Sequence, residues 1–169
     1  MPGCRTAVTA ENIPPILVLG VGNILMKDEG LGVHAARRLQ HTPLPTAVEV
    51  LDGGTAGMDL LYYLEGRKKV ILIDAIQTDE PPGTIFRLTP GDMGPVSKRE
   101  HFSLHQPGIF DVLRIADILG KSMPEVVIFA VQPADISMGT DLTPVINDKI
   151  PGLLHLVLNE IEKRKELAR

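Results

Sequence analysis

The stretch LVLGVGNILMKDEGLG, residues 17–32, leads from an apolar run through a glycine-rich turn to two adjacent acids, Asp28 and Glu29. The run ILVLG at 16–20 is rich in branched side chains and closes with Gly, which is typical of a buried parallel strand. Residues 30–40 then place an apolar side chain at every fourth position, which predicts a helix. A strand followed at once by a helix is how an α/β fold begins.

The rest of the chain repeats this alternation. Short apolar runs predict further strands at 48–51, 68–74, 83–88 and 126–133. Helical spacing predicts helices at 57–66, at roughly 106–119 and at the C-terminus, with a break or a fresh first turn at Pro151. Residues 83–88 alternate after a Pro-Pro-Gly turn, which suits an edge strand, and residues 89–104 are expected to form a loop. The pattern predicts an α/β fold with a mainly parallel sheet.

Length and composition fit one globular domain. The chain has 169 residues, of which 44% are hydrophobic and 22% are charged. We expect a flexible polar arm at 1–15 and a single α/β domain at 16–169. The net charge is −4 and no long basic run is present, so neither nucleic acid nor an anionic membrane is an expected partner.

The single cysteine, Cys4, excludes an internal disulfide and a multi-cysteine zinc cluster, and it suits a reducing compartment. The first fifteen residues lack the apolar segment of a signal peptide. No apolar run approaches the ~20 residues that a membrane-spanning helix needs. The expected location is therefore the cytoplasm.

Polar residues follow the predicted strands at the edge where an open parallel sheet binds its ligands. Asn23, Asp28 and Glu29 follow the first strand, Asp52 the second and Asp74 the third. Gln132 follows the last strand, and His105 stands at the start of the predicted helix near 106. The convergence of acids from three successive strands marks this edge as the candidate site.

The glycine turn does not match a phosphate-binding motif. The fingerprint G-x-G-x-x-G would start at Gly20 and Gly22, but its third glycine position is Leu25, and the Gly-Lys-Ser/Thr of a P-loop is absent. Asp28 and Glu29 would also repel a pyrophosphate. We expect the glycines to permit a tight turn that carries the acids across the end of the sheet.

Each candidate residue also has a purely structural interpretation. Glu29 could be a first-turn acid that stabilises a helix dipole, and Asp74 needs either a cation or a turn amide as partner. Asp52 before Gly-Gly favours an Asx turn or a cap. Histidine at the position of His105 is more often structural. Together, Glu29, Asp74 and His105 form a set of two carboxylates and one imidazole, which suits zinc, nickel, manganese or iron with open positions.

Five blocks of the sequence carry a family resemblance: VLGVGNILMKDEGLG, VLDGGTAG, ILIDAI, SLHQPG and AVQP. In this order and spacing, from about residue 16 to residue 160, they resemble the successive blocks of the [NiFe]-hydrogenase maturation endopeptidases. The resemblance implies a twisted, mostly parallel five-stranded sheet sandwiched between helices, a hydrolase-like or phosphorylase-like α/β fold. It also implies removal of a C-terminal extension from a nickel-loaded hydrogenase large-subunit precursor.

Residue by residue, the resemblance places the metal-contacting and catalytic positions at Glu29, Asp74 and His105. Asp52 matches a further acid of the family's cleft. Two mechanisms follow as hypotheses. In one, a metal such as zinc, held by the three residues, polarises the scissile carbonyl and activates water. In the other, the nickel of the precursor docks against them and positions the cut. Under either hypothesis, His105→Ala abolishes cleavage.

Two other classes of protein compete with this interpretation. A non-catalytic nickel-sensing or metal-carrying module could use the same ligands, but it would leave the mass of the precursor unchanged. A nucleotide- or phosphate-binding enzyme of similar layout would be stabilised by nucleotide and indifferent to metals. The missing P-loop residues and the acidic cleft count against the latter class.

Overall fold

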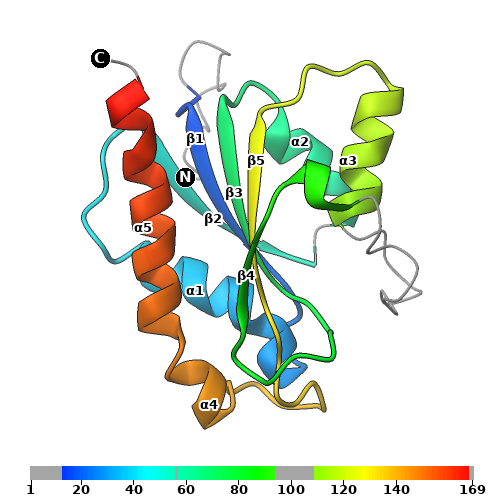
Figure 1. Ribbon diagram of the computed structural model, residues 1–169, viewed down its shortest axis with the longest axis vertical. Helices are drawn as coiled ribbons and strands as arrows, with labels where there is room; N and C mark the ends of the chain where they lie inside the picture. Colours follow the sequence, from blue (N-terminus) through cyan, green and yellow to red (C-terminus); the bar gives the residue numbers. More distant parts are fainter. Residues whose placement is uncertain (1–12, 56, 94–108, 168–169) are drawn as a thin grey trace, which may run out of the picture.

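The computed structural model describes residues 13–55, 57–93 and 109–167 and forms a twisted five-stranded sheet between helices (Figure 1). The strands are β1 (Ile16–Val21), β2 (Val48–Gly54), β3 (Lys69–Ala75), β4 (Ile85–Leu88) and β5 (Glu125–Val131). Their order across the sheet is β2-β1-β3-β5-β4, and all neighbours are parallel except β4, which runs antiparallel to β5. The predicted α/β class and the edge position of the strand near 83–88 are confirmed.

Helices cover both faces of the sheet. They are α1 (Leu31–Leu39), α2 (Leu60–Leu64), α3 (Ile109–Ile118), α4 (Pro144–Asn147) and α5 (Ile150–Leu167). Short 3-10 turns precede α1 and α2 and follow β4: η2 (Lys27–Gly30), η3 (Gly57–Asp59) and η4 (Pro90–Met93). Figure 1 shows α1 and α5 on one side of the sheet and α2 and α3 on the other.

The alternation of side chains along each strand divides the core into two layers. Ile16 and Val18 of β1 pack in one cluster with α1, α4 and α5, whereas Leu17 and Leu19 pack in a second cluster with α2 and α3. Every residue of β1 is buried. Strands buried on both faces read as continuous apolar runs, which is why the sequence revealed β1, β3 and β5 so directly.

The C-terminal segment forms two helices rather than one. Pro151 is the second residue of α5, where a missing N–H costs nothing and the fixed φ angle favours a helical turn. The predicted fresh first turn at Pro151 is therefore confirmed. Among the described helices, none is both long and apolar enough to cross a membrane. The predicted arm at 1–15 and the predicted loop at 89–104 fall largely outside the described residues.

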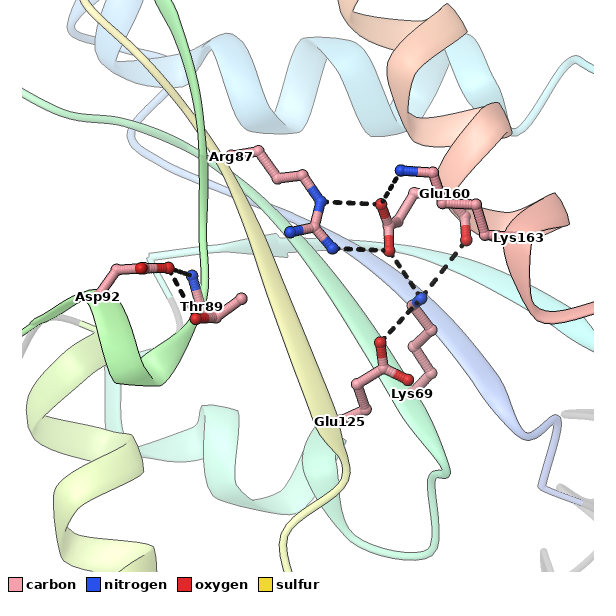
Figure 2. Close-up of polar contacts among 7 residues, drawn as sticks. All are labelled: Lys69, Arg87, Thr89, Asp92, Glu125, Glu160 and Lys163. Atoms are coloured by element: carbon pink, nitrogen blue, oxygen red, sulfur yellow. Dashed lines mark hydrogen bonds and ion pairs between the residues drawn. The ribbon is translucent and has the colours of Figure 1, made fainter. Parts of the chain in front are cut away.

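A buried ion network ties α5 to the amino-terminal end of the sheet (Figure 2). Glu160 of α5 is only 2% exposed, and its Oε1 lies 2.8 Å from Nζ of Lys69, the first residue of β3. Arg87 of β4 donates from Nε to Oε2 of Glu160 at 2.9 Å and from Nη2 to Oε1 at 3.1 Å. Lys69 also contacts Glu125 of β5 at 3.1 Å. The hydrogen bonds from Arg87 come first among the causes that lower the pKa of Glu160 to about 2.

Candidate functional site

The glycines of the first turn allow α1 to approach the ends of β1 and β3 at backbone contact distance. A Cβ atom on Gly32 would lie 2.1 Å from the carbonyl oxygen of Ile73 and 2.3 Å from that of Val21. A Cβ atom on Gly20 would lie 2.0 Å from the carbonyl oxygen of Gly32. No side chain fits at either position. The start of α1 therefore lies in backbone contact with the strand ends, and Asp28 and Glu29, which precede it, lie close to the same strand ends.

Gly22 has a second requirement, because its φ of 138° is one that side chains rarely adopt. A Cβ atom on this glycine would also lie 2.0 Å from the carbonyl oxygen of Glu29. The turn thus folds back so closely that Gly22 touches the backbone of Glu29. The glycine turn positions Glu29, as the sequence predicted.

Glu29 and Asp74 lie near each other at the carboxyl ends of β1 and β3. Both are partly buried. Burial is the largest cause that raises the pKa of Asp74 to about 7, and the negative charge of Glu29 raises it further. The backbone N–H of Ala75 donates to Oδ1 of Asp74 at 2.8 Å and opposes this effect. Burial also raises the pKa of Glu29.

This pair of acids has no compensating cation in the part of the chain that the structure describes. Neither Glu29 nor Asp74 forms an ion pair with another described residue, whereas Asp52 near the end of β2 and Asp135 after β5 do. Two neighbouring, partly buried carboxylates whose pKa values are raised form a site for a positively charged group. Carboxylate oxygens and an imidazole nitrogen are ligands that first-row divalent metals accept.

Asp28, which neighbours Glu29 in sequence, is structural. It is fully buried, and its carboxylate accepts hydrogen bonds from the backbone N–H groups of Ala134 and Asp135, both at 3.0 Å, and of Thr143 at 2.7 Å. The Thr143 hydroxyl donates a fourth hydrogen bond at 2.8 Å. Asp28 therefore ties the turn after β1 to the segment after β5. No local pattern revealed this role, because the partners lie 106 to 115 positions away.

Asp52 forms the predicted Asx turn at the end of β2. Its Oδ1 accepts a hydrogen bond from the N–H of Gly54 at 3.0 Å, and its Oδ2 accepts one from Nε of Arg37 at 2.9 Å. Its charge is thus matched by a cation of α1. In this structure Asp52 supports the turn rather than joining the acid pair.

Gln132, after β5, closes the neighbouring loop. Its Oε1 accepts hydrogen bonds from the N–H and the hydroxyl of Thr78 at 2.6 and 2.8 Å, and its Nε2 donates to the carbonyl of Pro133 at 3.1 Å. Both ends of the amide are therefore occupied by local partners. Its role among the described contacts is to hold the segments after β3 and β5 together.

His105 lies outside the described residues, so the third member of the predicted set stays a prediction. Within the described ranges, no cluster of three or more His, Cys, Asp or Glu side chains is placed to hold a metal ion. The structure brings Glu29 and Asp74 together and leaves the imidazole untested. Helix α3 begins at Ile109, four residues after His105, and its Val112 packs with Val70 and Leu72 of β3.

Comparison with known proteins gives matches in sequence and in structure. The family model for hydrogenase maturation proteases matches residues 33–160. A Hydrogenase expression/formation protein HupD of Bradyrhizobium diazoefficiens is 39% identical over 143 residues, which is 83% of this chain and 74% of the relative. The Hydrogenase 2 maturation protease of Escherichia coli is 39% identical over 145 residues, which is 85% of this chain and 88% of the relative.

Solved structures agree with the sequence matches. The hydrogenase maturating endopeptidase HybD of Escherichia coli superposes with a TM-score of 0.79 at 37% identity and covers 88% of this chain and 93% of its own. A hydrogenase 2 maturation peptidase from a Thaumarchaeota archaeon gives a TM-score of 0.66 at 28% identity, with coverage of 86% and 97%. The sheet and its flanking helices are therefore those of these endopeptidases.

Proposed function

Because the chain belongs to the hydrogenase maturation protease family, we propose that it removes the C-terminal extension of a [NiFe]-hydrogenase large-subunit precursor once nickel has been inserted. The chain is accordingly an enzyme of the protease class. The observation that supports this substrate is the acid pair of Glu29 and Asp74, which lies at the ligand-binding edge of the sheet without a compensating cation among the described residues.

The nickel of the precursor is part of the substrate in this proposal. A positive centre that enters beside Glu29 and Asp74 offsets the burial and the repulsion from Glu29 that together raise the pKa of Asp74. A precursor without nickel offers no such relief, so it binds more weakly. The acid pair would in this way distinguish loaded from unloaded precursor.

We assign His105 to the same site. The side chain of Asp74 follows Val70 and Leu72 at alternate positions of β3, so it is directed to the face of the sheet that α3 covers. His105 precedes α3 by only a few residues. Asp74 is therefore directed to the face of the sheet that α3 covers, and His105 comes shortly before α3 in the chain.

The same three residues fit a resident divalent ion such as zinc or nickel, since they offer two carboxylates and one imidazole. Such an ion, when bound, would supply Lewis-acid polarisation of the scissile carbonyl. Without a cation, Oδ2 of Asp74 can hold a proton near neutral pH, because Oδ1 already accepts the N–H of Ala75. We place the reaction in the cytoplasm, on the ground that a chain with one cysteine suits a reducing compartment.

The proposal is tested by incubating a cognate large-subunit precursor, with and without nickel, with this protein and measuring the mass of the product. We expect loss of a C-terminal peptide in the nickel-loaded sample alone. Glu29→Gln, Asp74→Asn and His105→Ala should each reduce the cleavage rate at least about a hundredfold. Glu80→Gln is the matched control, because Glu80 is an exposed acid on the segment that follows β3.

Three results would contradict parts of the proposal. Equal cleavage of both precursors would contradict the proposed dependence on nickel, but the assignment as a protease would stand. Undiminished cleavage by His105→Ala would remove that histidine from the site. Nickel binding with no change of precursor mass, for a cognate precursor, would identify a metal-carrying protein instead.

A further inference from the structure

Two large apolar side chains stand exposed beside the acid pair. Leu25 is 59% exposed and Met138 is 84% exposed. They belong to segments far apart in the chain that meet at a parallel bridge between Met26 and Gly139. The N–H of Gly139 donates to the carbonyl of Leu25 at 2.9 Å, and the N–H of Lys27 donates to the carbonyl of Gly139 at 2.8 Å.

This bridge brings the backbones of the two residues together. Leu25 and Met138 each stand one position before a bridge partner. The hydrogen bond between the N–H of Gly139 and the carbonyl of Leu25 joins the peptide group that follows Leu25 to the one that follows Met138. We call this pair the apolar ridge. Single exposed apolar residues are common on proteins, but two that separate segments bring to one place call for an explanation.

The backbone beneath the apolar ridge is held firmly. The buried carboxylate of Asp28 accepts hydrogen bonds from Ala134, Asp135 and Thr143. The N–H of Asp28 donates to the carbonyl of Asp135 at 3.1 Å, and the side chains of Lys27 and Asp135 form an ion pair. A surface built on such a frame loses little conformational freedom when a partner covers it.

The ridge is also adjacent to the proposed site. The N–H of Glu29 donates to the carbonyl of Met26 at 3.0 Å, so one turn of backbone connects the ridge to the acid pair. The side chains of Lys27 and Asp135, which stand close to Leu25 and Met138 in sequence, form an ion pair. A chain that crosses Glu29 would therefore meet apolar surface beside this ion pair.

We propose that the apolar ridge of Leu25 and Met138 binds an aliphatic side chain of the precursor segment that contains the scissile bond. This inference rests on the proposed function, because it names a contact of the same substrate. The ridge acts in positioning: it sets where the precursor chain lies relative to Glu29 and Asp74, and it does not touch the reacting bond. Its contribution is to substrate affinity and to the choice of cleavage site.

The test uses Leu25→Gln, Met138→Gln and the double variant, which keep side-chain length but replace apolar surface with an amide. Ile118→Gln is the matched control, because Ile118 is 75% exposed and lies at the end of α3. We expect the double variant to raise KM for the nickel-loaded precursor about tenfold with kcat within about twofold. When Leu25→Gln and Met138→Gln are added to the inactive variant Asp74→Asn, the Kd for the same precursor should rise by a similar factor over that of Asp74→Asn alone. Thermal unfolding should be unchanged.

Unchanged KM and Kd in the double variant would overturn the inference. Cleavage by the wild type in the same experiment would still support the proposed function. An equal rise with Ile118→Gln would overturn it too, since the effect would then follow loss of any apolar surface. If the wild type binds but does not cut the precursor, the proposed function fails and the Kd series still decides the ridge. If the double variant changes only concentration-dependent self-association, the occupant is a second copy of the chain and the inference is wrong.

Discussion

At the scale of single residues, the four acids of the strand ends differ in their partners. Asp28 is buried among four hydrogen-bond donors, and Asp52 is held by Gly54 and Arg37. Glu29 and Asp74 have no described cation and have raised pKa values instead. Acidic residues thus have a structural role at Asp28 and Asp52 and form the candidate site at Glu29 and Asp74. The partners, rather than the sequence neighbours, decide the role.

Asp74 should make the metal-free protein less stable at neutral pH. Its pKa is about 7 in the folded state and near 3.8 in the unfolded state, so the folded state binds more protons between these values. Stability from this group is therefore present below pH 3.8 and is lost as pH rises towards 7. Asp74→Asn should stabilise the chelator-treated protein by about 1–3 kcal/mol at pH 8 while abolishing cleavage.

Denaturant unfolding at pH 5, 7 and 8 measures this effect. The gain from Asp74→Asn should shrink as the pH falls towards 4, where Asp74 itself is protonated. Asp79→Asn serves as control, because Asp79 is an exposed acid of the same segment. A gain that does not change with pH would mean that ionisation of Asp74 is not its cause.

Some of the candidate site could be predicted from the chain and some could not. The rule that ligands bind at the carboxyl ends of parallel strands led to Glu29 and Asp74, and the structure brings both there. The same rule offered no way to separate Asp28 from Glu29. That separation depends on Thr143, 115 positions from Asp28, and on a segment that carries no motif. His105 stays a prediction from the sequence.

At the scale of elements, α5 is attached to the sheet by charge as well as by apolar packing. Glu160 joins α5 to β3 through Lys69 and to β4 through Arg87. Lys69 is itself only 3% exposed. A buried pair of this kind is costly to break, because removal of one partner leaves the other charge buried and unpaired.

Glu160→Gln should therefore lower the free energy of unfolding by about 2–4 kcal/mol at pH 7. The pKa of Glu160 is about 2 in the folded protein and near 4.5 when unfolded, so its stabilisation is present above pH 4.5 and is lost as the pH falls towards 2. The wild type should lose stability over this range more steeply than the variant. Urea titrations at pH 7 and pH 3 compare them.

Glu162→Gln is the control for this series, since Glu162 is an exposed acid of the same helix. It should unfold like the wild type at both pH values. If Glu160→Gln were equally harmless, the network in Figure 2 would contribute nothing to stability. Cleavage of the precursor should survive in folded Glu160→Gln, because the network lies at the other end of the strands.

Elements buried on both faces were predictable, and exposed ones were less so. β1, β3 and β5 read as unbroken apolar runs because neither face meets water. The extent of β2 was underestimated, since it continues through Asp52 and Gly53 to Gly54. Its pairing with β1 holds these residues in the sheet despite their turn-forming preference.

At the scale of the whole molecule, the candidate site and the ion network that attaches α5 lie at opposite ends of one sheet. The acid pair and the apolar ridge follow the carboxyl ends of the parallel strands. The network of Glu160, Lys69 and Arg87 stands at the amino ends of β3 and β5. Changes that weaken one end should leave the other intact, provided that the protein stays folded.

The close backbone contacts of Gly22 and Gly32 have a consequence for motion. A glycine-rich stretch is usually regarded as a hinge, but here the N–H of Gly22 donates to the carbonyl of Gly54 at 2.8 Å, and those of Lys27 and Asp28 donate to Gly139 and Asp135. These amides should exchange with deuterium about as slowly as those of β1. Rapid exchange at residues 22–29 would contradict this. On the proposed function, the precursor chain would have to fit itself to a turn that stays closed.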